Sequence, residues 1–78
     1  MISSGVDDMY PRIRALREDR DLNQTQVAKM LNMSQTGYSK YETGENDVPT
    51  HILIKLANFY ETSIDYILGL TENKKPYK

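Results

Sequence analysis

Helix-capping residues recur along this chain at intervals that leave room only for short helices. Asn23, Ser34, Thr50 and Ser63 are residue types that favour helix starts, and apolar residues at helical spacing follow each of them. No stretch alternates between apolar and polar residues for long enough to indicate a strand. The 78 residues have the length of a single domain. The sequence therefore predicts one compact all-α domain with five helices.

Two of these helices are predicted to be joined by a very tight turn. Asn23 caps the first of them, and Gln26, three residues later, completes an Asn variant of the capping box. Asn32 stands where this helix ends and tolerates the left-handed conformation that a tight turn needs. Ser34 caps the next helix only two residues later, and Gly44 closes it. This arrangement predicts a helix-turn-helix.

The other three predicted helices complete the folded domain. Apolar periodicity and end signals place them at about residues 10–20, 50–60 and 63–69. Thr50 and Ser63 cap the last two, and Gly69 ends the last. We expect the chain to have three parts: a flexible N-terminus (1–8), the helix-turn-helix domain (9–70) and a basic mobile tail (71–78).

Charge is distributed unevenly along the chain, although the net charge is only −1. Residues 10–41 contain six basic and three acidic residues, which leaves this half with a charge of +3. Residues 42–72 contain six acidic residues and one basic residue, which leaves that half with −5. An anionic partner would therefore approach the first half. The alternative is an excess of arginine on a solvated helix, with no partner implied.

Several kinds of chemistry are absent from the sequence. The chain has no cysteine, which excludes disulfides, thiolate zinc sites and thiol catalysis. Its one histidine, His51, has no second metal ligand nearby, and no catalytic triad or glycine-rich phosphate loop is present. We therefore expect no enzyme, no cofactor, no metal and no small-molecule ligand. The longest apolar run is Ile52–Ile54 and no signal peptide is evident, so we expect a cytoplasmic protein without membrane contact.

From Arg12 to Leu70, the chain resembles the Cro/repressor-type helix-turn-helix family, the lambda-repressor-like or XRE-type DNA-binding domains. The order and spacing of the following segments carry the resemblance: Ile13-Arg-x-Leu-Arg, Leu22-Asn-Gln, Val27-Ala, Leu31-Asn-Met-Ser, Lys40-Tyr-Glu-x-Gly, Pro49, Leu56-Ala and Ser63-Ile-Asp-x-Ile-Leu-Gly. The resemblance implies a compact five-helix domain whose second and third helices form the helix-turn-helix. It also implies binding to operator DNA, usually as a dimer on a palindromic site.

The chain departs from the family pattern at three places. Asn32 occupies the turn position where the family usually has glycine, and Tyr38 occupies a position in the third helix where the family usually has an aliphatic residue. The loop after that helix is often basic in the family, but here it carries Glu45 and Asp47.

The third predicted helix has a buried face, with Tyr38 and Tyr41, and an outward polar face. The outward residues are Gln35, Thr36, Ser39 and Lys40. Gln pairs with adenine through two hydrogen bonds, Lys donates to guanine, and the Thr methyl group contacts the thymine methyl group. We therefore expect Gln35, Thr36 and Lys40 to contact bases and Ser39 to contact a phosphate. The alternative is a solvated face that contacts nothing.

Further residues are expected to contact phosphates or to orient the third helix. Gln24 opens the second helix, where free backbone N–H groups favour anions, and the resemblance implies the same role. Thr43 and Asn46 in the following loop are further phosphate candidates. Arg17 and Glu42 match a family pair that joins the first helix to the end of the third, orients it and holds Arg17 near phosphate. The alternative for that pair is two unrelated surface charges.

The C-terminal helices carry more apolar residues than a small core needs. Ile54 and Phe59 belong to this surplus, and the expected dimer interface is formed by Ile64, Tyr66, Ile67 and Leu70. The alternative is that all of them belong to the core of the domain. The predicted function is a transcriptional regulator, a repressor that binds double-stranded DNA as a homodimer through the major groove. The competing prediction is a protein-interaction module, such as an antitoxin subunit.

Overall fold

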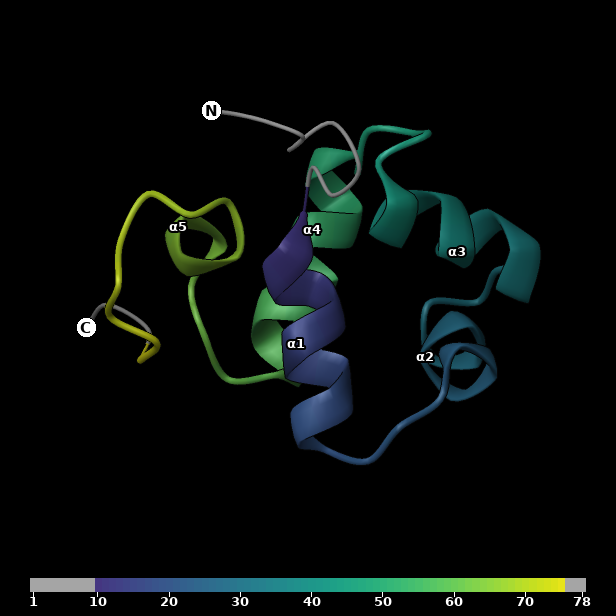
Figure 1. Cartoon of the computed structure of the whole chain (residues 1–78), viewed down its shortest axis with the longest axis horizontal. Coiled ribbons are helices and arrows are strands. Elements are labelled where there is room, and N and C mark those ends of the chain that lie inside the picture. The colour runs from purple at the N-terminus through teal and green to yellow at the C-terminus, as the bar shows by residue number, and fades with distance from the viewer. Residues whose placement is uncertain (1–9, 76–78) are drawn as a thin grey trace.

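The computed structural model describes residues 10–75. It contains five helices and, within this range, no strand: α1 (Pro11–Asp19), α2 (Gln24–Met30), α3 (Gln35–Thr43), α4 (Thr50–Phe59) and α5 (Ile64–Ile67). In Figure 1, α1 crosses the centre of the molecule with α4 behind it, α2 and α3 lie on one side and α5 on the other. Helix α1 contacts both α3 and α5, so it joins the two sides. The predicted all-α, five-helix fold is confirmed.

Three of the predicted helix caps are present. The Asn23 side chain accepts a hydrogen bond from the Gln26 backbone N–H at 2.8 Å, and the Gln26 side chain accepts one from the Asn23 N–H at 2.8 Å. Ser34 and Ser63 each cap their helix through the side-chain oxygen, which accepts a backbone N–H at 3.0 Å. These bonds satisfy backbone donors that a helix start leaves without a partner.

The predicted cap of α4 is wrong by one residue. Pro49, with extended backbone angles, takes the capping position, and Thr50 is already the first helical residue. The Pro49 carbonyl accepts hydrogen bonds from the N–H groups of Ile52 and Leu53, and no side chain caps this helix. Proline has no side-chain acceptor, so the first N–H groups of this helix receive no side-chain cap.

Four helices end in the same backbone motif. After α2, Asn32 adopts a left-handed φ of 61°, and the next N–H, that of Met33, donates back to the Ala28 carbonyl at 3.0 Å. This is the Schellman motif, which satisfies carbonyl groups at the helix end. Asp21 after α1, Glu61 after α4 and Gly69 after α5 take the same left-handed role. Asn32 and Gly69 were predicted as helix ends, whereas Asp21 and Glu61 were not.

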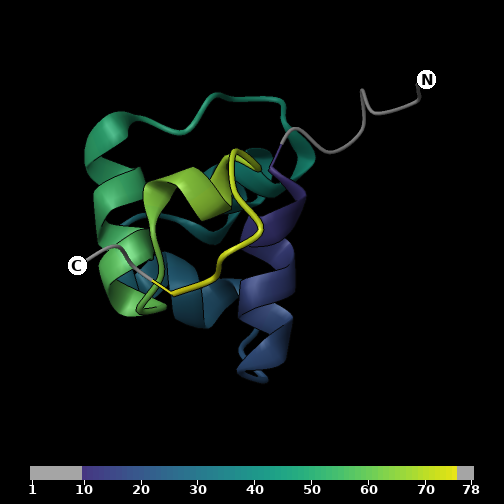
Figure 2. The ribbon, with the colours of Figure 1, turned by 90° about the vertical axis from the view of Figure 1, so that its left-hand side faces the viewer.

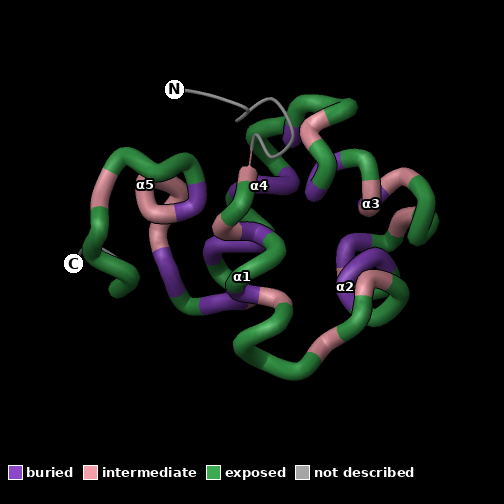
Figure 3. The backbone as a smooth tube through the Cα atoms, viewed as in Figure 1, coloured by how far each residue is buried: buried purple, intermediate pink, exposed green. Residues whose placement is uncertain are grey.

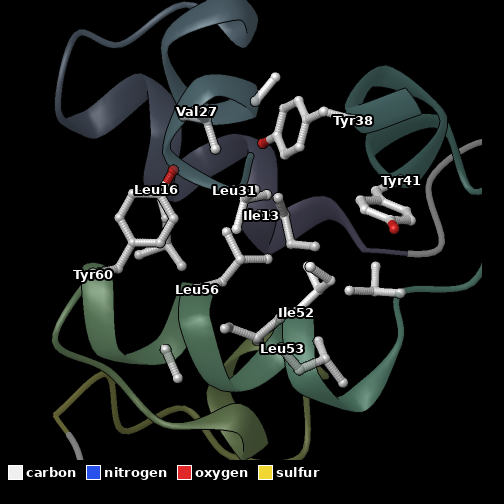
Figure 4. Close-up of a cluster of buried hydrophobic side chains, with 14 residues drawn as sticks. Ile13, Leu16, Val27, Leu31, Tyr38, Tyr41, Ile52, Leu53, Leu56 and Tyr60 are labelled. Carbon is white, nitrogen blue, oxygen red and sulfur yellow. The ribbon is translucent and has the colours of Figure 1, made fainter. Parts of the chain in front are cut away.

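The core lies between α1, α2, α3 and α4 (Figure 4), with Ile67 of α5 completing it. Tyr38 is fully buried and meets Tyr41 edge to face, with ring centroids 6.4 Å apart, as their inward spacing predicted. The buried positions of the tube in Figure 3 follow the inner side of each helix. Ile67 is 1% exposed in this core, so its side chain is not available to a second protomer. Its assignment to the dimer interface was therefore wrong, because the short α5 needs it to cover the core.

Residues 71–75 lie along the body of the domain (Figure 2). The Arg12 guanidinium stacks on the Tyr66 ring, 4.1 Å from its centroid, and donates to the Thr71 carbonyl at 2.6 Å. Thr62 donates to the Lys74 carbonyl, and the Lys74 ammonium lies 3.2 Å from the Asp19 carboxylate. These contacts involve Thr71 and Lys74, which belong to the tail that was expected to be mobile. The expected flexibility of residues 1–8, the domain start at Met9 and the end of the tail at 76–78 lie outside the described residues.

Candidate nucleic-acid interface

Helix α3 presents the polar face that its sequence predicted. Gln35, Thr36 and Lys40 are exposed and Ser39 is half-buried, whereas Tyr38 and Tyr41 fill the core behind them. Figure 1 shows α3 at the edge of the molecule, with only α2 directly beneath it in that view. An isolated face of this kind can enter a groove about 12 Å wide, which is the width of the DNA major groove.

Arg17 of α1 and Glu42 of α3 form an ion pair inside the protein. The Arg17 Nε donates to Glu42 Oε2 at 2.6 Å, and its Nη2 donates to Oε1 at 3.1 Å. The side chains are only 12% and 4% exposed, which excludes the alternative of two unrelated surface charges. The third Arg17 nitrogen, Nη1, donates to the Leu22 carbonyl at 2.9 Å. All three side-chain nitrogens of Arg17 are therefore engaged with groups of the protein itself.

Glu42 receives two further hydrogen bonds from neutral side chains. Tyr38 donates its hydroxyl to Oε2 at 2.5 Å, and the Gln24 amide donates to Oε1 at 3.0 Å. Burial by itself raises the pKa of Glu42, but the bonds from Arg17, Tyr38 and Gln24 together outweigh it and hold that pKa below its ordinary value of 4.5. The hydrogen bond to Glu42 correspondingly raises the pKa of Arg17. The pair is therefore fully ionised at neutral pH.

The first residues of α2 and α3 are bonded to each other through their side chains. The Gln35 Nε2 donates to Gln24 Oε1 at 2.6 Å, while the Gln24 Nε2 donates to Glu42. Gln24 is half-buried and Gln35 is exposed, so the bonds lead from the buried carboxylate to the surface. Both glutamines were expected at the site, but this contact between them was not. Their positions at the starts of two helices joined by a tight turn are the sequence signal for it.

The other two phosphate candidates lie at the end of α3, where Thr43 is the last helical residue, and in the loop after it, where Asn46 stands. The Thr43 hydroxyl donates to the Lys40 carbonyl at 3.3 Å, and the Asn46 backbone N–H donates to the same carbonyl at 3.2 Å. Both residues are exposed, as are the neighbouring Glu45 and Asp47. Thr43 and Asn46 thus lie beside the end of α3, and two carboxylates share the loop with Asn46.

The outward face of α3 combines hydrogen-bond donors and acceptors with a single positive charge. Its only acidic residue, Glu42, is turned inside and neutralised by Arg17. The exposed groups on the face are therefore an amide, hydroxyls and the Lys40 ammonium. These are groups that pair with base edges and phosphate oxygens.

The remaining arginines of the first helix have structural partners. Arg12 packs on Tyr66, and Arg20 lies over the ring of Tyr60 at 5.6 Å and donates to its carbonyl at 3.2 Å. Arg14 forms an exposed pair with Glu18 at 3.2 Å. Arg12 thus has a structural role, because its guanidinium holds the C-terminal segment against α1.

Two further features concern the part of the chain that the structure describes. Between residues 10 and 75, no group of three or more histidine, aspartate or glutamate side chains gathers where a metal ion could be held. None of the five helices combines the length and the apolar composition needed to cross a bilayer.

Residues 13–67, which run from α1 to the end of α5, match the helix-turn-helix family. The chain belongs to this family. The helix-turn-helix is formed by α2 and α3, and the XRE-type resemblance inferred from the sequence is confirmed. No solved structure is significantly similar to the chain.

Several curated relatives share this helix-turn-helix domain. YobD of Bacillus subtilis, named an uncharacterized HTH-type transcriptional regulator, is 37% identical over 65 residues, which are 83% of this chain and 58% of that protein. ImmR of the same organism, named an HTH-type transcriptional regulator, is 36% identical over 82% of this chain and 50% of its own length. RstR of Vibrio cholerae, named a cryptic phage CTXphi transcriptional repressor, is 36% identical over 78% of this chain and 55% of its own length. The chain therefore spans about half the length of these relatives.

Proposed function

We propose that this helix-turn-helix chain is a sequence-specific DNA-binding transcriptional regulator, and that it acts as a repressor. The observation that carries the proposal is the exposed polar face of α3, which is held from behind by the buried Arg17–Glu42 pair. The names of the relatives agree with it, since two are HTH-type transcriptional regulators and one is a transcriptional repressor.

In this proposal, α3 lies in the major groove and its outward side chains contact base edges. Gln35 pairs with adenine, Lys40 donates to guanine O6 or N7, and Thr36 packs its methyl group against thymine. Their exposure on one helix face supports these roles.

Phosphate contacts at both ends of α3 fix the position of the helix in the groove. Gln24, Ser39, Thr43 and Asn46 supply them in this proposal, together with backbone N–H groups at the start of α2. Arg17 keeps the orienting role that was expected of it, but its nitrogens are engaged with Glu42 and Leu22. Its proposed contribution to phosphate binding is therefore indirect, through the placement of α3.

We further propose that the protein binds a palindromic operator as a homodimer. Leu70 is 72% exposed and Ile64 and Tyr66 are half-buried, so these three of the four expected dimer residues retain surface for a second copy. Leu68, which was not among the expected dimer residues, is also exposed. A two-fold dimer would place the two α3 helices about 34 Å apart on one face of the DNA, which is one helical turn.

The test is selection of bound duplexes from a random pool at low ionic strength. The proposal predicts a palindromic consensus with half-sites one turn apart. A consensus without symmetry would contradict the proposed homodimer but not the proposed role as a transcriptional regulator. A protein that enriches no duplex, but retains a stoichiometric protein partner from its host, would contradict the regulator and support the interaction module.

A further inference from the structure

Three side chains form a hydrogen-bonded series from the core to the outer face of α3. Glu42 lies in the interior, Gln24 is half-buried at the start of α2, and Gln35 is exposed at the start of α3. Gln24 donates its Nε2 to Glu42 at 3.0 Å, and Gln35 donates its Nε2 to Gln24 Oε1 at 2.6 Å. Each link joins a donor of the outer residue to an acceptor of the inner one.

The direction of this series follows from the chemistry of its inner end. A carboxylate only accepts hydrogen bonds, whereas an amide has a donor end and an acceptor end that exchange when it turns over. The ionised Glu42 therefore makes Gln24 turn its NH₂ group inward, which leaves the Gln24 oxygen facing Gln35. Gln35 must then direct one N–H to that oxygen, and it retains its second N–H and its own oxygen for other partners.

That remaining pair of groups is what a bidentate contact with adenine needs. Adenine offers N7 as an acceptor and its N6 amino group as a donor, so the amide must present both of its ends in one orientation. An amide that is already oriented loses less rotamer freedom when it binds. An amide turned the other way would present the wrong group at each position.

We propose that Glu42 is a specificity-determining positioning residue, which through Gln24 sets the direction in which the Gln35 amide presents its donor and acceptor to a base. This inference rests on the proposed function, in which Gln35 faces a base pair. It adds a role to Glu42 beyond its ion pair, because Oε1 accepts from Gln24 as well as from the Arg17 Nη2, while Oε2 accepts from Tyr38 and the Arg17 Nε.

Two substitutions interrupt the series in different ways. Glu42→Gln introduces a donor at the inner end, so the Gln24 and Gln35 amides can both turn over while Arg17 keeps an acceptor. Gln24→Ala removes the middle link, leaves the ion pair in place and lies outside the core, so it keeps the test available if Glu42→Gln does not fold. Tyr38→Phe is the matched control, because it removes a different donor to Glu42 and leaves the Gln24–Gln35 bond intact.

The experiment measures base preference at one position of the selected duplex. That position is the one whose preference is lost in Gln35→Ala, and the readout is the ratio of affinities for the best and second-best base there. We expect Glu42→Gln and Gln24→Ala each to lower this ratio about tenfold or more, while preferences at the other positions are retained. Tyr38→Phe should leave the ratio unchanged. In a Gln35→Ala background, adding Glu42→Gln should not lower the ratio further.

The outcomes separate this inference from the proposed function. A clear consensus in which Glu42→Gln or Gln24→Ala leaves the ratio unchanged overturns the inference alone. Equal loss of preference at all positions overturns it as well, because that is the result of a purely structural role. A wild-type protein that selects no duplex contradicts the proposed function and overturns the inference with it.

Discussion

Two buried tyrosines differ in what their hydroxyl groups contact. Tyr38 donates to the Glu42 carboxylate, and burial together with that bond raises the pKa of Tyr38. Tyr60 is 3% exposed, and its hydroxyl has no hydrogen-bond partner among residues 10–75. Burial raises the pKa of Tyr60 to about 12. The same functional group therefore stabilises the fold at one position and opposes it at the other.

This contrast predicts opposite effects for the same substitution. Tyr38→Phe should lower the free energy of unfolding by about 1.5–3 kcal/mol, because it removes a hydrogen bond to a charged group. Tyr60→Phe should leave it unchanged or raise it by about 1 kcal/mol, because it removes a buried group without a partner. Urea unfolding at pH 7 measures both. A larger loss for Tyr60→Phe than for Tyr38→Phe would contradict the two environments described.

Glu42 makes the stability of the fold depend on pH. Its pKa is lower in the folded state than its ordinary value of 4.5, so its contribution is complete above that value and is lost as the pH falls through the folded-state pKa. Glu42→Ala should cost about 3–5 kcal/mol at pH 7, because the buried Arg17 charge loses its partner. The difference between wild type and variant should shrink as the pH is lowered below 4.5.

Thermal unfolding across pH 3–7 tests this prediction, with Glu45→Ala as the control. Glu45 is an exposed carboxylate in the next loop, so its removal should change stability by no more than about 0.5 kcal/mol at any of these pH values. A Glu42→Ala effect that stays constant over the range would show that the carboxylate charge is not what the ion pair contributes.

At the scale of the elements, the repeated Schellman motif stores strain at residues that lack the freedom of glycine. Glu61 has φ of 55° after α4, a conformation that costs an L-residue other than glycine roughly 1–2 kcal/mol. Glu61→Gly should therefore stabilise the protein by up to about 1 kcal/mol. Lys55→Gly, in the middle of the same helix, should destabilise it by about 0.5–1 kcal/mol. Thermal unfolding of the two variants checks the sign, and destabilisation by both would contradict the role assigned to φ.

The elements also show what local sequence signals can and cannot predict. Asn23, Ser34 and Ser63 were predicted as caps because their oxygens act on donors three residues away in the same helix. The left-handed Glu61 was missed because glutamate has no intrinsic preference for that conformation, and packing of α5 against α4 imposes it. The burial of Ile67 was missed for a similar reason, since periodicity in a four-residue helix does not distinguish the core from an interface.

At the scale of the whole molecule, the candidate site was predictable in its residues but not in its connections. The outward positions of Gln35 and Lys40 follow from helix periodicity once Tyr38 is placed inside. The bond between Glu42 and Gln24 joins two helices across 18 residues of sequence, so no local pattern indicates it. Tyr38 lies one turn before Glu42 on the same helix, but their contact depends on the burial of both side chains. The segment held by Arg12 likewise depends on a contact across more than fifty residues.

The distribution of charge over the molecule predicts a weak dependence of DNA affinity on salt. Arg12, Arg17 and Arg20 are engaged with the protein itself, and the loop after α3 carries Glu45 and Asp47. Few cations remain to displace counterions, so log K should fall with log salt at a slope of about −2 to −4 per protomer. Affinity measured between 50 and 300 mM salt, a range of ~sixfold in concentration, tests this slope. A slope near −8 would show a basic surface that the described residues do not present.

The most direct test of the central claim, that the outer face of α3 contacts bases, is the affinity of Lys40→Ala for a set of duplexes that differ from the selected site by one base pair each. We expect a loss of about 1–3 kcal/mol on the selected site and little preference left at one base pair, with the other positions still discriminated. Lys55→Ala, an exposed lysine on α4, serves as the control and should match wild type. An equal loss for Lys40→Ala on every duplex would contradict base contact by this face of α3, because it would show a contact with phosphate alone.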